Sequence, residues 1–197
     1  MIIARNHETK KLVICLPRNA STRLEDIINQ NKNWKKLSDT HQVQLHRSLG
    51  YKVYGSIRHP VERFCSWYGN FILDKPHTYN QHRVFSDPYG WNEEDIENFF
   101  ELFKFTMHYD EHTQFQMMQY ESLNISLDKI KFFDFKKLDK IMEVQHDYDV
   151  IYRTTWNRYK DEVSPGVSEK IIQCATEVYK HDIIWYEKIM EKNLKNG

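Results

Sequence analysis

Two short segments of the chain combine arginines with hydroxyl groups in a way that suits the binding of anions. The first, residues 17–23, reads Pro-Arg-Asn-Ala-Ser-Thr-Arg, and the second, residues 58–66, reads Arg-His-Pro-Val-Glu-Arg-Phe-Cys-Ser. Guanidinium groups and hydroxyls form charge-assisted hydrogen bonds to phosphate or sulfate oxygens. The two segments therefore predict two anion-binding sites. Their candidate ligand-binding residues are Arg18, Asn19, Ala20, Ser21, Thr22, Arg23, Arg58 and Ser66.

The first segment stands where an expected strand gives way to an expected helix. The apolar run 12–16 is short, rich in β-branched residues and ended by Pro17, which is typical of a buried strand. Apolar residues at helical spacing begin at Leu24, and Ser21 or Thr22 is the expected N-cap of that helix. Free backbone N–H groups and the helix dipole meet at such a junction, so it should attract anions.

The second junction has the same order of elements. Residues 51–57 predict a strand, and Pro60 suits the first position of a helix. Behind Pro60, aromatic side chains recur at steps of three and four, which predicts one buried helical face. These aromatic residues are Phe64, Trp67, Tyr68 and Phe71. Arg63 on the same helix is interpreted as a structural brace for the motif.

The rest of the chain continues the alternation of strands and helices. Helices are expected at 93–107, 112–121 and 167–192, and a strand at 129–135 with a further helix behind it. Residues 75–92 predict a long surface loop, and residues 31–50 are too polar to assign. Because no repeat or linker interrupts this order, we expect one domain, residues 1–197, of the α/β class, with a small parallel sheet flanked by helices.

Composition and charge exclude several classes of function. Lys and Arg total 28 and Asp and Glu total 28, whereas proteins that hold nucleic acid by its phosphates carry a basic excess. No apolar run approaches the ~20 residues that cross a bilayer, and the start of the chain lacks the apolar segment of a secretory signal. The three cysteines, Cys15, Cys65 and Cys174, are typical of buried thiols in a reducing compartment. We therefore expect a cytoplasmic protein with a small-molecule partner, no nucleic acid and no membrane span; the sequence does not indicate its oligomeric state.

The two anion-binding segments also resemble the signature motifs of a known enzyme family. The first segment lacks both glycines and the lysine of the nucleotide-triphosphate P-loop, GxxxxGK[ST], which disfavours hydrolysis of ATP or GTP. It is similar instead to the 5′-phosphosulfate loop of the sulfotransferase family, P-K-T-[AG]-[SG]-T-S. The second segment is similar to that family's 3′-phosphate motif, R-D-P-x-x-R-x-x-S. The chain thus resembles the short soluble bacterial and viral relatives of the carbohydrate sulfotransferases.

The resemblance implies a P-loop-like sulfotransferase fold and 3′-phosphoadenylyl sulfate (PAPS) as the sulfuryl donor, with no metal. The acceptor would be a hydroxyl of a carbohydrate or small metabolite. Residues 18–23 would hold the 5′-phosphate, and Arg58 and Ser66 would hold the 3′-phosphate. Thr155 falls where relatives place a loop that closes over the nucleotide. Arg18 takes the position of the family's lysine and would stabilise charge on the leaving phosphate oxygen.

A general base must also remove the proton of the acceptor, and relatives place a histidine or glutamate between the two motifs. His41 is the expected base because an imidazole titrates near neutral pH, and His46 is the second choice. His112 and Gln116 resemble an H-x-x-x-Q segment of the relatives and, with His46, are candidate acceptor contacts. Each of these residues also has a plainer interpretation as a solvated polar side chain.

Two other functions stay open at this point. A nucleotide-dependent kinase-like enzyme is disfavoured by the missing P-loop lysine and by the lack of an obvious magnesium-binding acidic strand end. A non-catalytic module that binds phosphonucleotides would keep both anion motifs without turnover. The chain departs from the family pattern at His59, where the family has an aspartate, and at Arg23, where it has a serine or threonine. Residues 108–112 include metal-capable side chains without a recognised zinc-binding spacing.

Overall fold

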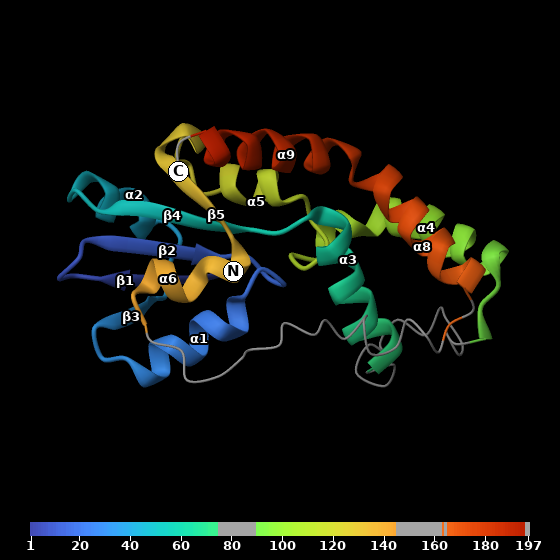
Figure 1. Ribbon diagram of the computed structural model, residues 1–197, viewed down its shortest axis with the longest axis horizontal. Coiled ribbons are helices and arrows are strands. Elements are labelled where there is room, and N and C mark those ends of the chain that lie inside the picture. Colours follow the sequence, from blue (N-terminus) through green and yellow to red (C-terminus); the bar gives the residue numbers. More distant parts are fainter. Residues whose placement is uncertain (75–89, 145–162, 164, 196–197) are drawn as a thin grey trace. The chain divides into compact units, whose positions relative to one another are not determined.

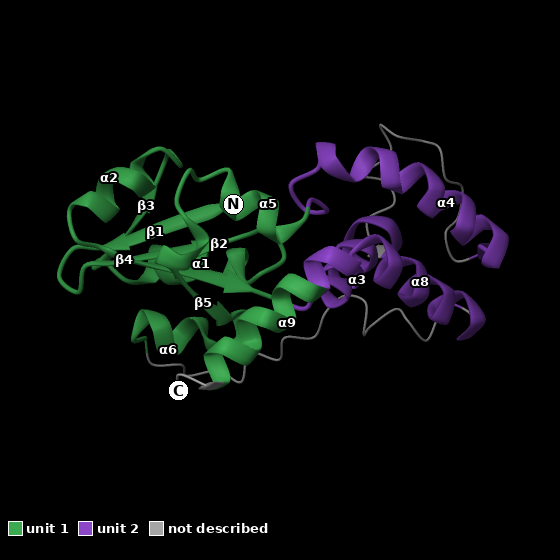
Figure 2. Ribbon diagram, turned by 90° about the horizontal axis from the view of Figure 1, so that it is seen from above, with its two compact units in different colours: residues 1–58, 115–150, 184–197 green, residues 59–114, 151–183 purple. Residues whose placement is uncertain are grey.

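The computed structural model describes residues 1–74, 90–144, 163 and 165–195. The chain forms two compact units, each made of separate parts of the sequence (Figure 2). Unit 1 comprises residues 1–58, 115–150 and 184–197, and unit 2 comprises residues 59–114 and 151–183. The second predicted motif is therefore divided between the units directly after Arg58.

Unit 1 contains a five-stranded sheet with the strand order β3-β1-β2-β4-β5 (Figure 1). The strands are β1 (Ile2–Asn6), β2 (Lys11–Cys15), β3 (Trp34–Leu37), β4 (Lys52–Ile57) and β5 (Ile130–Asp134). β2, β4 and β5 are parallel, whereas β1 is antiparallel to both of its neighbours, β2 and β3. The expectation of a purely parallel sheet is thus wrong. β1 and β2 are joined by the short turn 7–10, and so short a connection can only join antiparallel strands.

Helices cover both faces of the sheet in unit 1. Along β2, Leu12 and Ile14 face one side, and Val13 and Cys15 face the other. The first face packs against α2 (Gln42–Ser48), α5 (Gln116–Glu121) and, from residue 184 on, α9 (Lys180–Lys195). The second face packs against α1 (Ser21–Gln30) and α6 (Leu138–Met142). The single-turn helices η5 (Leu127–Lys129) and η6 (Phe135–Lys137) flank β5. Burial on both faces explains why the central strands are continuous apolar runs.

Unit 2 is helical and has an aromatic core. Its elements are α3 (Pro60–Tyr68), the π-helix η1 (Gly69–Asp74), α4 (Glu93–Thr106), η4 (Met107–Tyr109), α8 (Pro165–Val178) and the first turn of α9. The ring of Phe64 lies 5.3 Å from the rings of both Phe100 and Phe103, measured between centroids. Trp67 and Tyr68 are buried as well. Three of the four aromatic residues predicted behind Pro60 are therefore part of the core, whereas Phe71 lies in η1 and is half-buried.

The structure confirms the expected strands at β2, β4 and β5, the helix start at Pro60, and the helix over 93–107. Residues 31–50, which the sequence left unassigned, contain β3 and α2. The helix expected over 112–121 begins only at Gln116, because the N–H groups of Thr113 and Gln114 both donate to the carbonyl of Asp110 and close a turn. The expected final helix is divided at Tyr179 into α8 and α9. Most of the expected loop 75–92 lies outside the described residues.

Candidate anion-binding site

The loop after β2 turns the chain sharply into α1. Arg18 and Ala20 both have left-handed backbone conformations, with φ of 65° and 62°. Residues other than glycine rarely adopt this conformation. The N–H of Asn19 donates to the carbonyl of Leu16 at 3.0 Å and closes the turn. Strained backbone of this kind persists only where its surroundings hold it, and it is concentrated at ligand-binding sites.

Helix α1 begins at Ser21, with Ala20 as its N-cap. The expectation that Ser21 or Thr22 caps the helix is therefore wrong, because both residues lie inside its first turn. Within the described part of the chain, no side chain caps this helix at Ala20. The first-turn N–H groups and the positive end of the helix dipole thus stand at the loop together with the two hydroxyl-bearing residues, which is the arrangement that favours an anion.

The side chain of Arg58 lies against the loop of the first motif. Its Nη1 donates to the carbonyl of Arg18 at 3.2 Å, and its Cζ lies 4.7 Å from the centre of the Phe135 ring. The sheet explains this contact, because β2 and β4 pair in parallel as far as Cys15 and Ser56. The segments that follow β2 and β4 therefore leave the sheet side by side. Only 5% of the Arg58 residue surface is exposed.

A buried polar network joins the same two strand ends. Asn19 is fully buried, and its Nδ2 donates to the carbonyl of Ser56 at 3.2 Å and to Oε1 of Gln116 at 2.5 Å. The hydroxyl of Ser56 donates in turn to the carbonyl of Asn19 at 2.9 Å. Gln116 was expected to contact an acceptor, but its amide is fully buried and engages this network instead. Asn19 therefore fixes the loop to β4 through its side chain and its backbone.

Arg23 forms an ion pair instead of standing free beside the loop. Its Nε lies 3.1 Å from Oδ1 of Asp139 on α6, and both side chains are largely buried. The ion pair ties α1 to α6 on one face of the sheet. The guanidinium of Arg23 therefore has a structural contact inside unit 1 in addition to its predicted role in binding a 5′-phosphate.

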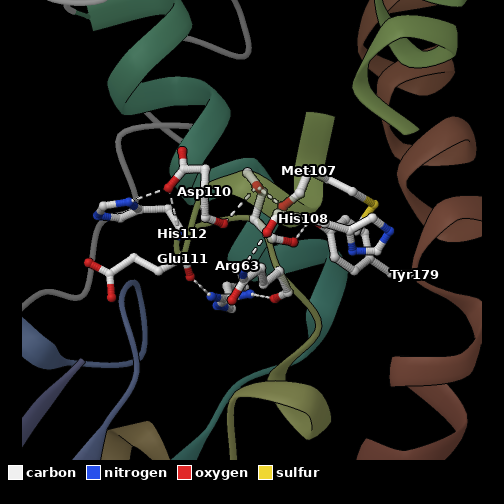
Figure 3. A network of polar contacts seen from close by, with 9 residues as sticks. Arg63, Met107, His108, Asp110, Glu111, His112 and Tyr179 are labelled. Carbon is white, nitrogen blue, oxygen red and sulfur yellow. Dashed lines mark hydrogen bonds and ion pairs between the residues drawn. The ribbon is translucent and has the colours of Figure 1, made fainter. Parts of the chain in front are cut away.

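Two residues of the second motif lie in unit 2 on α3. Ser66 is buried there, and its predicted partnership with Arg58 stays a prediction. Arg63 is also buried, and its Nη1 and Nη2 donate to the carbonyls of Gln114 and Glu111 at 2.7 and 2.8 Å (Figure 3). The hydroxyl of Tyr179 donates to the carbonyl of Thr113 in the same network at 2.5 Å. The interpretation of Arg63 as a structural brace agrees with these contacts, which hold the segment 111–114 rather than the motif itself.

The two histidines expected near the acceptor in unit 1 differ in their surroundings. His41 is exposed at the start of α2, and its backbone N–H donates to Oδ1 of Asp39 at 2.8 Å. His46 is buried, with Nδ1 2.7 Å from the carbonyl of Gln42 and Nε2 2.7 Å from Nη1 of Arg5. A carbonyl only accepts and a guanidinium only donates, so Nδ1 carries the proton and the ring is neutral. His46 thus has both nitrogens engaged inside unit 1, and the expectation that it contacts an acceptor or serves as a base gains no support from the structure.

His112 pairs with a carboxylate in unit 2. Its Nδ1 lies 2.8 Å from Oδ1 of Asp110 (Figure 3). Its ring packs edge-on against Phe71. A carboxylate holds the Nδ1 proton of an imidazole and leaves Nε2 able to accept another, which is the arrangement of a general base. Asp110 was not among the predicted site residues. The Asp-x-His spacing is the signal that could have found it, because the backbone N–H of His112 also donates to Asp110, at 2.8 Å.

The remaining expectations concern a nucleotide loop, metals, thiols and membranes. Thr155 lies outside the described residues. Among residues 1–74, 90–144, 163 and 165–195, no group of three His, Cys, Asp or Glu side chains could hold a metal ion. Burial raises the pKa of the Cys15 thiol, which lies at the end of β2, to about 12. No helix in the described parts of the chain is both long and apolar enough to cross a bilayer.

Comparison with known proteins gives no relative from which a function could be transferred. No family model, no curated protein and no solved structure matches the chain. The two motifs and the geometry of unit 1 are therefore the features that bear on its function.

Proposed function

We propose that the protein is a sulfotransferase that moves a sulfuryl group from PAPS to a hydroxyl of a carbohydrate or small metabolite. The observation that carries the proposal is the hydrogen bond from Nη1 of Arg58 to the carbonyl of Arg18, 3.2 Å long. This bond places Arg58, the first residue of the motif that resembles the 3′-phosphate site of sulfotransferases, against the loop that resembles their 5′-phosphosulfate site, at adjacent ends of parallel strands. A donor with a 5′-phosphosulfate and a separate 3′-phosphate needs two neighbouring anion sites of this kind.

The residues of unit 1 have separate roles in the proposed reaction. The first turn of α1, with Ser21 and Thr22, holds the 5′-phosphosulfate through N–H and hydroxyl groups. Arg18 stabilises the negative charge that develops on the phosphate oxygen as the bond from that oxygen to sulfur breaks. Arg58 provides the positive charge for the 3′-phosphate, which distinguishes this donor from ATP. The role of Ser66 at that phosphate is proposed from the sequence motif alone.

The transfer itself requires placement and charge stabilisation more than covalent chemistry by the protein. The acceptor oxygen forms a new bond to sulfur while the bond from sulfur to the 5′-phosphate oxygen breaks. The acceptor proton passes to a base, and adenosine 3′,5′-bisphosphate leaves. His41 is the base proposed from the sequence.

Binding of adenosine 3′,5′-bisphosphate tests the proposal most directly. We expect this nucleotide to raise the unfolding temperature of the protein by mass action, and we expect ATP with magnesium to leave it unchanged. The opposite pattern would refute the sulfotransferase and favour a kinase-like enzyme. Binding of the bisphosphate without transfer of radiolabelled sulfate from PAPS to a panel of glycans and phenols would identify a non-catalytic module.

A matched pair of variants tests the role of Arg58. Arg58→Lys keeps the positive charge but loses the planar fork, and we expect it to weaken bisphosphate binding about tenfold. Arg47→Lys makes the same change at an exposed position on α2 and should leave the affinity unaltered. Equal affinities for the two variants would remove Arg58 from the site.

A further inference from the structure

Gln116 makes an unusual set of contacts for a residue at the start of a helix. It is the first residue of α5 and is fully buried. Its Oε1 accepts from the backbone N–H of Arg58 at 3.1 Å and from Nδ2 of Asn19 at 2.5 Å. Its Nε2 donates to the carbonyl of Arg58 at 2.8 Å. One side chain thus binds the first predicted motif through Asn19 and the second through Arg58.

The chemistry of these groups allows only one orientation of each amide. The backbone N–H of Arg58 can only donate and its carbonyl can only accept, so they fix which end of the Gln116 amide faces which group. The oxygen of Gln116 then requires a donor from Asn19, which fixes the Asn19 amide as well. Rotating either amide by 180° would place donor against donor and acceptor against acceptor in a buried site, which would leave hydrogen bonds unsatisfied.

The sheet does not hold these two positions against each other. The ladder between β2 and β4 ends at the pair Cys15 and Ser56, before either Asn19 or Arg58 is reached. Beyond this pair, side chains take over the role of ladder hydrogen bonds. Helix α5 presents Gln116 and, one turn later, Tyr120, whose hydroxyl donates to the carbonyl of Ser56 at 2.6 Å. Helix α5 therefore adds contacts from outside the two strands to the direct bonds that Ser56 and Arg58 make to the loop.

We propose that Gln116 is a positioning residue that fixes the spacing between the two anion-binding motifs, so that one ligand with two separated phosphates engages both at once. This inference rests on the proposed function, and it concerns the recognition of the donor rather than of the acceptor. A ligand that binds at two points gains affinity only when both points have the right separation. Gln116 therefore contributes to the affinity for bisphosphates and not to the affinity for monophosphates.

The test compares three nucleotides on the full-length protein by chemical-shift titration. Adenosine 3′,5′-bisphosphate uses both motifs, whereas adenosine 3′-monophosphate and 5′-monophosphate use one each. In Gln116→Met, whose side chain has a similar length without the amide, we expect bisphosphate affinity to fall about tenfold or more. Affinity for each monophosphate should change less than about threefold, because a single motif needs no partner at a set distance.

A second variant keeps the inference testable if the methionine variant does not fold. In Gln116→Glu, the ionised carboxylate accepts but cannot donate to the carbonyl of Arg58, whereas the protonated carboxyl can do both. Burial favours the neutral form, so lowering the pH from about 8 to about 5 should restore the donor. At each pH, the ratio of bisphosphate affinity to monophosphate affinity is measured for the variant and divided by the same ratio for the wild type. We expect this quotient to return towards one as the pH is lowered over this range. Loss of structure alone would reduce the binding of all three nucleotides together and would leave this ratio unchanged.

The outcomes separate the two proposals. If the wild-type protein does not bind the bisphosphate, both the sulfotransferase and the positioning role are refuted. If the wild-type protein binds it and the variants weaken all three nucleotides equally, or none of them, the positioning role alone is refuted. Selective loss of the bisphosphate, with recovery at low pH in Gln116→Glu, supports the positioning role.

Discussion

Gly55 in β4 is a position where a single added methyl group should destabilise unit 1. A Cβ at this position would lie 2.9 Å from Cε1 of Tyr120, 3.0 Å from Cγ2 of Ile130 and 3.0 Å from Cδ1 of Phe132. Tyr120 cannot move away easily, because it is fully buried and its hydroxyl is bonded to the carbonyl of Ser56. The absence of a side chain at Gly55 is thus what allows α5 to lie so close to the strand.

We expect Gly55→Ala to lower the free energy of unfolding by about 1–3 kcal/mol, the usual cost of overpacking a core. For a chain of this size that corresponds to a fall of about 2–12 °C in unfolding temperature. Urea titration followed by circular dichroism, with a thermal scan, measures both quantities. The substitution should also reduce affinity for adenosine 3′,5′-bisphosphate, because a displaced α5 carries Gln116 with it.

Gly166→Ala in α8 is the matched control. A Cβ there would meet only the flexible end of the Glu93 side chain, with Oε1 at 3.0 Å. Alanine also has a higher helix propensity than glycine, so this variant should be as stable as the wild type or more stable by up to about 1 kcal/mol. If Gly55→Ala proved as stable as Gly166→Ala, the close packing of α5 on β4 would be refuted.

Three further predictions concern other parts of the structure. Desolvation is the largest cause that lowers the pKa of His7 from 6.5, and the positive charge of Arg5 is the next. The unfolded chain therefore binds the proton more readily than the folded one. The free energy of unfolding, measured by urea titration, should be constant above about pH 6.5 and fall below it, and it should fall less in His7→Gln. Tyr179→Phe removes the hydrogen bond to the buried carbonyl of Thr113 and should cost about 1–3 kcal/mol in the same assay, whereas no change would exclude a contribution from that bond. Cys15, with its pKa raised to about 12 by burial, should react with a disulfide reagent more slowly than the half-buried Cys174, and equal rates would contradict the burial of Cys15.

The sequence predicted the elements whose side-chain pattern is determined locally. The central strands are continuous apolar runs, and Pro60 marks the start of α3 by its fixed backbone angle. β3 could not be found in this way, because only Trp34 and Leu37 of its four residues are buried. The antiparallel direction of β1 was missed, although the short turn 7–10 that joins β1 to β2 is a sequence feature that indicates it.

The structure brings Arg58 of the predicted site against Arg18, and the role of these residues in binding an anion stays a prediction. The convergence of residues 17–23 with Arg58 followed from the rule that parallel strands end at one edge of a sheet. The contacts of Gln116 could not be predicted, because they join it to Arg58, 58 positions away in the sequence. The surroundings of His46 could not be predicted for a similar reason. Its Arg5 partner lies on β1, and no sequence pattern links the two.

The division of the chain into two interleaved units has a consequence for its synthesis. The sheet of unit 1 receives β5 only after residue 130 and the packing of α9 only after residue 184. Ribosomes add about 5–20 residues per second, so the first strands wait on the order of ten seconds for the segments that cover them. During this interval β2 and β4 lack the part of α9 that covers one of their faces in the folded protein. The last helix is therefore the step at which protection against aggregation becomes complete.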